Sequence, residues 1–288
     1  MSWLKVVAKR ICDSILGPMG YEIKRKTHEE LPHPITPGIL TEEMLRSNRI
    51  AAHEQSVEST VHPKDYVYYV CLTHRPRVAE GINYYFENGG VSATKLSNII
   101  SALDFPKEQR INLLEFASGY GCVSRHLKKN PRLQLVSCDI HPEAVDFLQN
   151  ALGISAMSSV HVPEEFSPPD KYDVVFALSF FSHMPRPTFG RWLRALFRTL
   201  TVPGYLVFTT QGRKLLQAMK LVEPIPDGFW FARESEQKDL DTDEYGTSIA
   251  LPEFVIPELY RQTGGTIVTY KQADWWELQD LWVVKREK

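Results

Sequence analysis

The chain has 288 residues, of which 43% are hydrophobic and 24% are charged, and its formal net charge is -2 at pH 7. This composition excludes a disordered or collagen-like chain, and so small a net charge excludes a global attraction to nucleic acid, because phosphate binding needs a basic surplus. No stretch reaches the roughly 18 consecutive apolar residues of a membrane span, so no transmembrane helix is expected.

The cysteines and histidines show no metal-binding or redox spacing. Cys12, Cys71, Cys122 and Cys138 form no CxxC pair, HExxH is absent, and the nine histidines are scattered. We therefore expect reduced thiols, a cytoplasmic location and no metal site.

Residues 1–26 have the pattern of a basic amphipathic helix. Their apolar residues recur at helical spacing up to Gly17-Pro18, and Lys9 and Arg10 interrupt the apolar run that a secretory signal would need. Such a helix either attaches peripherally to an anionic membrane or a partner, or packs on its own domain. Both alternatives stay open.

Residues 27–89 are predicted to form a helical and linker region. Prolines stand at 32, 34 and 37, and a polar helix is expected over residues 42–58 with Thr41 as its N-cap. A tyrosine-rich stretch begins at Tyr66 and ends in Asn88-Gly89-Gly90, a pattern typical of a chain reversal.

From residue 90 to the end, strand and helix patterns alternate at short intervals, which predicts an α/β fold with a doubly wound, mostly parallel sheet. Ligands bind beyond the carboxyl ends of such strands. Strands are expected at 111–116, 133–138, 154–158, 172–178 and 205–210, and helices at 123–129, 142–152 and 188–200.

The first strand runs into a glycine-containing turn that suits close approach of a ligand. Gly119 and Gly121 form a G-x-G pair ahead of a helix, a pattern used for dinucleotides and for adenosyl sulfonium compounds. Glu115 at the strand end repels a pyrophosphate but accepts hydrogen bonds from an ammonium or orders the loop. Ser124 and Arg125 stand where a dinucleotide site has its third glycine, so the sulfonium ligand is favoured.

The sequence Glu115-Phe116-Ala117-Ser118-Gly119-Tyr120-Gly121 resembles motif I of the class I S-adenosylmethionine-dependent methyltransferases, an acid followed by Gly-x-Gly-x-Gly. Ala117 replaces the first glycine, and we expect it to forbid an unusual backbone angle there. The resemblance covers roughly residues 90–286. It implies a Rossmann-like fold and S-adenosylmethionine as cofactor, held across the ends of the first, second and fourth strands by residues that include Glu115, Ala117, Ser118, Gly119 and Gly121.

The ends of the second and third strands supply further expected donor contacts. In the family, the position of Asp139 accepts both ribose hydroxyls, and the next residue, Ile140 here, lies against the adenine. Alternatively, Asp139 or His141 caps the helix that starts at Pro142. Where the family often has an acid near the adenine amino group, this chain has Ser158 and Ser159, whose hydroxyls can take that role.

The fourth strand opens into a loop that contains Leu178, Ser179 and His183. Family members place the transferable methyl group and the acceptor beside this loop, which implies donor contacts for Leu178 and Ser179. His183 can accept the proton of a hydroxyl acceptor as general base, or it is a loop histidine hydrogen-bonded to backbone.

Residues 221–244 form an acidic and aromatic insertion. Asp227-Gly228 is followed by three aromatic residues and then by six acidic residues that face only Arg233 and Lys238. This combination suits a sugar-like acceptor, or it is a hairpin that buries its aromatic side chains and exposes its acids. A helix at 252–263 and strands at 266–270 and 278–285 resemble the end of the family's sheet, with an antiparallel last strand.

The aromatic side chains before Gly90 are expected to close over bound S-adenosylmethionine as a lid. The hydroxyl of Tyr85 would then form a hydrogen bond with the carboxylate of that ligand. The alternative is that Tyr84, Tyr85 and Phe86 only pack the N-terminal helices onto the sheet.

These patterns predict a methyltransferase (EC 2.1.1.-) that methylates an oxygen of a small or glycan-like acceptor. The altered first glycine and the missing third acid leave a competing hypothesis, a non-catalytic binding or scaffold module on the same fold.

Overall fold

The computed structural model describes residues 37–219, 225–235, 237 and 239–288. The amphipathic helix predicted for residues 1–26 therefore lies outside the described residues, as do the start of the linker and residues 221–224 of the insertion. The described residues form two compact units, one that ends at Ser159 and one that begins at Val160. In the described part of the chain, no helix combines the length and the apolar character needed to cross a membrane.

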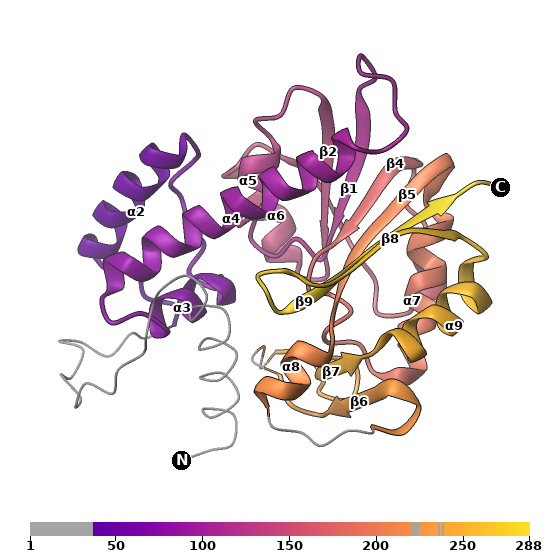
Figure 1. Cartoon of the computed structure of the whole chain (residues 1–288). Helices are drawn as coiled ribbons and strands as arrows, with labels where there is room; N and C mark the ends of the chain where they lie inside the picture. Colours follow the sequence, from indigo (N-terminus) through magenta and orange to yellow (C-terminus); the bar gives the residue numbers. More distant parts are fainter. Residues whose placement is uncertain (1–36, 220–224, 236, 238) are drawn as a thin grey trace. The chain divides into compact units, whose positions relative to one another are not determined.

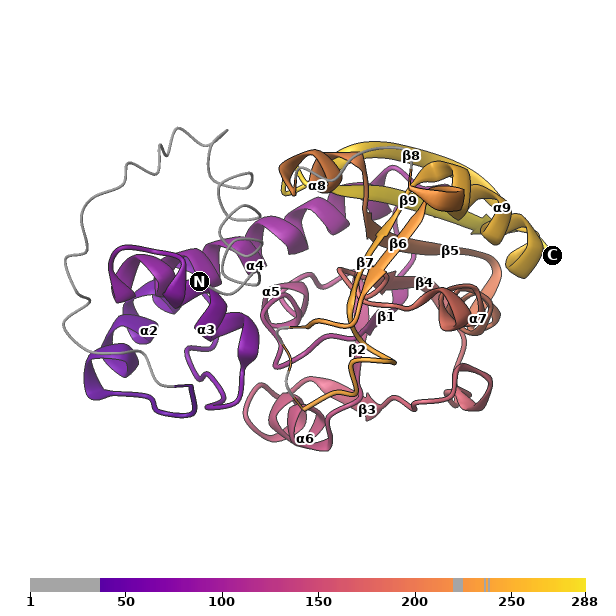
Figure 2. The same cartoon turned by 90° about the horizontal axis from the view of Figure 1, so that it is seen from below.

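The first unit begins with helices α2 (Glu42–Gln55), α3 (Tyr66–Thr73) and α4 (Val78–Ser101), of which α2 and α3 pack against α4 (Figure 1 and Figure 2). Thr41 is the N-cap of α2, as predicted, and its Oγ1 accepts a hydrogen bond from the backbone N–H of Met44 at 3.2 Å. Asp65 caps α3 in the same way, with its Oδ1 3.1 Å from the backbone nitrogen of Tyr68. Side chains from all three helices form one buried cluster.

The chain reversal predicted at Asn88-Gly89-Gly90 is wrong, because these residues lie inside α4. A Cβ at Gly89 would lie 2.2 Å from the carbonyl oxygen of Cys122, and one at Gly90 would lie 3.2 Å from Nδ1 of His126. The glycines therefore let α4 approach the following segment closely instead of bending the chain. The domain boundary expected at residue 90 falls within this helix.

Three parallel strands complete the first unit in the order β3-β2-β1: β1 (Ile111–Phe116), β2 (Leu133–Asp139) and β3 (Ser155–Ser158). Short helices α5 (Ser124–Leu127) and α6 (Pro142–Asn150) follow β1 and β2. In this register Glu115 pairs with Ser137, and Asp139 pairs with Ser158. Parallel strands with aligned ends bring the residues that follow them to one edge of the sheet.

The second unit holds β4 (Tyr172–Ala177), β5 (Leu200–Gln211), β8 (Thr266–Trp275) and β9 (Gln279–Arg286). Strands β4 and β5 are parallel, whereas β9 runs antiparallel to both of its neighbours, β5 and β8. Over the chain the sheet order is β3-β2-β1-β4-β5-β9-β8. The Rossmann-like α/β fold with an antiparallel last strand is confirmed.

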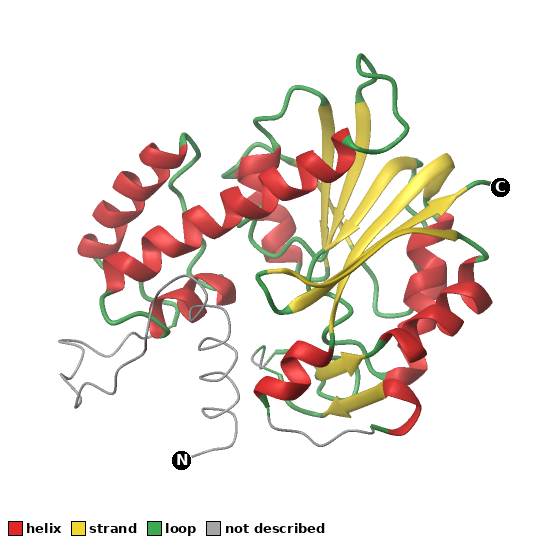
Figure 3. Cartoon of the chain, viewed as in Figure 1, coloured by secondary structure: helices red, strands yellow, loops and turns green. Residues whose placement is uncertain are grey.

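The remaining elements of the second unit are helical turns, helices and a separate strand pair. They are η2 (Pro163–Glu165), α7 (Arg186–Arg198), α8 (Arg213–Ala218), η3 (Pro226–Gly228), β6 (Phe229–Ala232), β7 (Thr247–Ala250) and α9 (Pro252–Thr263). Figure 3 shows β6 and β7 as a short antiparallel pair, with Phe229 opposite Ala250. Phe229 is buried, Trp230 and Phe231 are half-buried, and Asp239, Asp241, Asp243 and Glu244 are exposed.

Candidate functional site

The turn after β1 contains three residues with left-handed backbone angles. Ala117 has φ 57°, Gly119 has φ 56° and Gly121 has φ 79°. The expectation that alanine forbids such an angle at position 117 is wrong, because Ala117 adopts it. A left-handed conformation costs an L-amino acid on the order of 1–2 kcal/mol, so the surroundings of this turn hold it in place.

Replacing Ala117 with glycine is expected to raise the free energy of unfolding by about 1 kcal/mol, because glycine adopts this angle without strain. Urea denaturation measures the change. The matched control is Ala144→Gly inside α6, where glycine is expected to destabilise by about 0.5–1 kcal/mol. A loss of stability in both variants would contradict the strain at position 117.

The two glycines of the turn are needed for different reasons. A Cβ at Gly119 would meet nothing within 4 Å, so the space above this residue is open. A Cβ at Gly121 would lie 2.6 Å from Cδ1 of Leu152 and 2.9 Å from Cδ2 of Leu148. Gly121 therefore allows packing inside the unit, whereas Gly119 leaves room for a ligand.

Gly121→Ala is expected to destabilise the chain by about 2–4 kcal/mol, because both the angle and the overpacking are unfavourable. Gly119→Ala is expected to cost only about 1–2 kcal/mol from the angle. Urea denaturation of the two variants measures both values. Equal losses would mean that the contacts with Leu148 and Leu152 do not distinguish the two positions.

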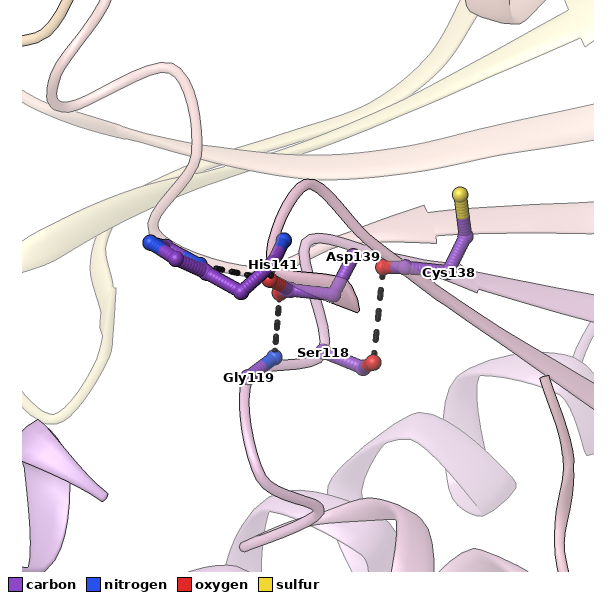
Figure 4. Close-up of polar contacts among 5 residues, drawn as sticks. All are labelled: Ser118, Gly119, Cys138, Asp139 and His141. Atoms are coloured by element: carbon purple, nitrogen blue, oxygen red, sulfur yellow. Dashed lines mark hydrogen bonds and ion pairs between the residues drawn. The ribbon is translucent and has the colours of Figure 1, made fainter. Parts of the chain in front are cut away.

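Asp139, at the end of β2, is the polar centre of this edge. Figure 4 shows its carboxylate between Gly119 and His141: Oδ2 accepts from the N–H of Gly119 at 2.7 Å, and Oδ1 accepts from the N–H of His141 at 3.0 Å. Nδ1 of His141 lies 2.9 Å from Oδ1. Asp139 is only 5% exposed, and no side chain caps α6, so the capping alternative for Asp139 and His141 is wrong.

The other residues of the first unit that are predicted to contact S-adenosylmethionine lie around this carboxylate. Ser118 ties the turn to β2: its backbone N–H donates to the carbonyl of Cys138 at 3.0 Å, and its hydroxyl donates to the same carbonyl at 3.4 Å, the bond drawn in Figure 4. Ser159 donates from its backbone to the carbonyl of Asp139 at 2.8 Å. Ser158 is exposed at the end of β3, and Ile140 is half-buried directly after β2.

Glu115 lies inside the unit, with an exposed fraction of 4%. Its Oε2 accepts hydrogen bonds from the hydroxyl of Ser124 at 2.5 Å and from that of Ser137 at 3.2 Å. Burial raises the pKa of this carboxyl to about 7, against the opposing effect of the two hydroxyls. Of the two roles expected for Glu115, these contacts favour ordering of the loop and its helix.

Tyr85 does not have the surroundings of a lid residue. It is fully buried in α4, its hydroxyl donates to Oδ2 of Asp65 at 2.6 Å, and its ring packs edge-on against Tyr68 and Phe86. The turn that was expected to swing it over the donor is part of the helix. The structural alternative therefore holds for Tyr85, and the donor contact predicted for it is not supported.

In the second unit, the loop after β4 is held by a buried polar network. Ser179 has φ 57°, and its backbone N–H donates to Oγ1 of Thr209 at 2.8 Å. Thr209 in turn donates to Oε1 of Gln279 at 2.6 Å, and Nε2 of Gln279 donates to Oγ of Ser179 at 2.8 Å. Leu178, which precedes Ser179, is half-buried.

His183 lies in the same loop and is fixed on two sides. Its Nδ1 is 2.8 Å from the carbonyl oxygen of Gly246, and its ring stacks on that of Tyr245 with centroids 4.4 Å apart. Because a carbonyl oxygen only accepts, Nδ1 carries the proton, and the neutral ring has its lone pair on Nε2. The backbone-bonded alternative for His183 is thus true, and it is compatible with a role as base.

Thr209 and Gln279 join the polar network of Ser179 without any local sequence pattern that predicts it. Gln279 is 100 residues away from Ser179 in the chain, and no local motif surrounds it. Within the described residues, no group of three or more His, Cys, Asp or Glu side chains has the arrangement of a metal site.

Residues 114–206 match a family model described as a methyltransferase domain. No curated protein matches the chain. Among solved structures, the PH0226 protein from Pyrococcus horikoshii OT3 is 15% identical with a TM-score of 0.50, covering 68% of this chain and 89% of that chain. An S-adenosylmethionine-dependent methyltransferase from Clostridium acetobutylicum is 12% identical with a TM-score of 0.48, covering 69% and 92%. The N-methyltransferase NodS from Bradyrhizobium japonicum in complex with S-adenosyl-L-homocysteine is 15% identical with a TM-score of 0.46, covering 70% and 88%.

Proposed function

We propose that this chain is a class I S-adenosylmethionine-dependent methyltransferase that methylates an oxygen atom of a small or glycan-like acceptor; its residues 114–206 match the methyltransferase domain family. The observation that carries this proposal is the hydrogen bond from Nδ1 of His183 to the carbonyl of Gly246, at 2.8 Å. It leaves the lone pair of a neutral imidazole on Nε2, the form that removes a proton from a hydroxyl group.

The turn after β1 fits the donor. Open space above Gly119 and a buried carboxylate at Asp139 are what an adenosyl ligand with ribose hydroxyls requires. We propose that Ala117, Ser118, Gly119 and Asp139 hold it, with Ile140, Ser158 and Ser159 toward the base. When bound, S-adenosylmethionine supplies an electrophilic methyl group on its sulfonium.

The segment after the acidic stretch supports the choice of acceptor. Gly246 donates from its backbone to the carbonyl of His183 at 2.9 Å, and Ser248 donates to that of Ser182 at 2.8 Å. These bonds join the loop that carries His183 to the segment that directly follows the exposed acids of residues 239–244. Carboxylates next to the half-buried Tyr245 suit a polyhydroxylated acceptor, by hydrogen bonding and stacking.

The alanine in place of the first glycine does not favour a non-catalytic module. Ala117 adopts the left-handed angle that the first glycine of the motif would provide, with φ 57°. The departure from the motif therefore leaves the shape of the turn intact.

The test is a donor-consumption screen over sugars, nucleotide sugars, phenols and amines, with the mass and fragmentation of each product. Matched pairs, such as a hexose and the corresponding hexosamine, separate the two atoms that can be methylated. We expect O-methylated products. Consumption of donor with amines alone, giving N-methylated products, would overturn the proposal.

His183→Asn is expected to lower kcat by about 10–100-fold and to leave donor affinity within twofold. The asparagine amide keeps a donor for the carbonyl of Gly246 but has no basic nitrogen, and loss of a general base typically costs such a factor or more. Initial rates with the acceptor found in the screen give kcat, and calorimetry gives the donor affinity. The control is His161→Asn, on an exposed side chain that pairs with Glu244 at 3.3 Å. Wild-type turnover in His183→Asn would exclude its role as base.

We further propose a cytoplasmic location, which is supported by Cys71, Cys122 and Cys138 being reduced thiols rather than members of disulfides. No nucleic-acid partner is proposed. The basic residues of 1–26 would add attraction to anionic lipid, and co-sedimentation with anionic and neutral vesicles tests that contact.

A further inference from the structure

Arg125, on α5, is a buried cation that donates hydrogen bonds to neutral oxygen atoms of the first unit and lies over the rings of Tyr85 and Phe86, at 5.5 Å and 5.3 Å from their centroids. It is 3% exposed. Its Nε donates to the carbonyl of Gly121 at 3.0 Å, and its Nη2 lies 3.4 Å from the carbonyl of Tyr120. One side of the guanidinium therefore holds the last two residues of the glycine-containing turn.

The other side of the same guanidinium holds residues that precede Arg125 by 40 to 67 positions. Nη1 donates to the carbonyls of Glu58 at 2.8 Å and Thr60 at 3.0 Å. Nη2 donates to the hydroxyl of Tyr85 at 3.3 Å, and this hydroxyl donates to Asp65. The planar fork of an arginine can serve several acceptors at fixed angles, which a lysine cannot.

Two further contacts join the segment 58–65 to the donor edge. The ring of His62 stacks on that of Tyr120, with centroids 4.4 Å apart and planes 8° apart. Lys64 forms an ion pair with Glu143 of α6 at 2.7 Å. The segment thus contacts both the turn after β1 and the helix after β2.

The turn needs such support because of Ala117, which has a left-handed angle without being a glycine, unlike Gly119 and Gly121. A conformation of this kind persists only where its surroundings over-determine it. The backbone N–H of Gly119 donates to Asp139. In the chain, Gly119 lies between Ala117 and the two residues whose carbonyls contact Arg125, namely Tyr120 and Gly121.

We propose that Arg125 is a positioning residue for donor binding: it couples the segment 58–65 to the turn that receives S-adenosylmethionine, without touching the donor itself. By linkage, donor binding must then order this segment, and loosening the segment must weaken donor binding by the same factor. The proposal rests on the donor site described above and is independent of which acceptor the enzyme uses.

The experiment measures binding of S-adenosyl-L-homocysteine by calorimetry, without acceptor, together with amide hydrogen exchange of the full chain. Arg125→Gln is expected to weaken binding at least tenfold and to speed exchange in residues 58–65 and 118–121. Arg125→Lys is expected to recover part of the affinity. In the wild type, the ligand is expected to slow exchange in residues 58–65.

The matched control is Arg132→Gln. Arg132 also donates to two carbonyls, those of Gln109 at 3.1 Å and Pro106 at 2.9 Å, but it stands at the start of β2, away from the strand ends. We expect the Arg132→Gln variant to be less stable than the wild type and to keep its affinity for S-adenosyl-L-homocysteine within twofold. Wild-type affinity in Arg125→Gln would overturn the proposal, and so would a loss in Arg132→Gln as large as in Arg125→Gln.

If Arg125→Gln does not fold, the variant Tyr85→Phe tests the coupling between the segment 58–65 and donor binding. It removes one hydroxyl, which links Arg125 to Asp65, and keeps the ring in the core. We expect about threefold to tenfold weaker binding and faster exchange in residues 58–65. Unchanged binding and exchange in Tyr85→Phe would then overturn the coupling. A failure of the acceptor screen would leave all these measurements unaffected.

Discussion

Asp139→Ala is expected to weaken binding of S-adenosylmethionine by at least about 100-fold while the chain stays folded. The carboxylate accepts the N–H groups of Gly119 and His141, at 2.7 Å and 3.0 Å, and hydrogen bonds to a charged group contribute about 1.5–3 kcal/mol each. The variant loses both the anchor of the turn and the acceptor for the ribose hydroxyls. Calorimetric titration gives the affinity, and thermal melting followed by circular dichroism checks the fold.

Two further variants make this prediction specific to Asp139. Asp146→Ala removes an exposed carboxylate of α6 that accepts a hydrogen bond from Asn150 in the same helix, at 2.7 Å, and should keep full affinity. Asp139→Asn keeps the shape but turns an N–H₂ group toward one of the two backbone N–H groups, so we expect intermediate binding. Wild-type affinity in Asp139→Ala would place the donor elsewhere.

The strands of this fold could be predicted to within one or two residues where they are short and buried. The runs at 111–116 and 172–178 are apolar and bounded by polar or glycine-containing turns, and the structure places β1 at Ile111–Phe116 and β4 at Tyr172–Ala177. Strand β5 begins at Leu200, five residues earlier than expected. Its first part is partly exposed, so no run of apolar residues announces it.

The glycines of α4 show why a local signal can mislead. Asn88-Gly89-Gly90 is typical of a turn, but the choice between turn and helix depends on what the glycines pack against. The buried positions of α4 recur at helical spacing across this point, at Ile82, Tyr85, Phe86, Gly89 and Ala93. That periodicity was the signal for a continuous helix, and it favours core positions for the aromatic residues.

At the site, positions in a linear motif could be predicted and partners distant in the chain could not. Gly119 and Asp139 follow strands in a known spacing, and the structure joins them by a hydrogen bond. Arg125 stood out only as a bulky residue in place of a glycine, because its partner Glu58 lies 67 residues away. No pattern in one sequence indicates that pairing.

Because of Glu115, we expect the free energy of unfolding to fall as the pH rises toward neutrality. Burial raises the pKa of this carboxyl from its ordinary value of 4.5 to about 7. The folded chain therefore binds the proton more tightly than the unfolded chain does. Below pH 4.5 both forms are protonated and the full contribution to stability is present. It is lost as the pH rises through about 7.

The expected loss is on the order of 3 kcal/mol between pH 4.5 and 7.5, since a tenfold change in proton affinity corresponds to about 1.4 kcal/mol. Burial also raises the pKa of Asp65 and Asp280, so the wild type alone does not isolate Glu115. Glu115→Gln does, because the amide keeps an acceptor for the hydroxyls of Ser124 and Ser137 but does not titrate.

The measurement is the free energy of unfolding by urea, for wild type and Glu115→Gln, from pH 4.5 to 8. We expect the wild type to lose stability relative to the variant across this range, with half of the change at about pH 6, midway between the pKa values of the unfolded and folded chains. The cause is a carboxylate that must lose its proton at an exposed fraction of 4%. A difference between the two proteins that stays constant with pH would mean that folding leaves the pKa of Glu115 at its ordinary value, and one that grows in favour of the wild type would mean that its two hydroxyl partners outweigh burial.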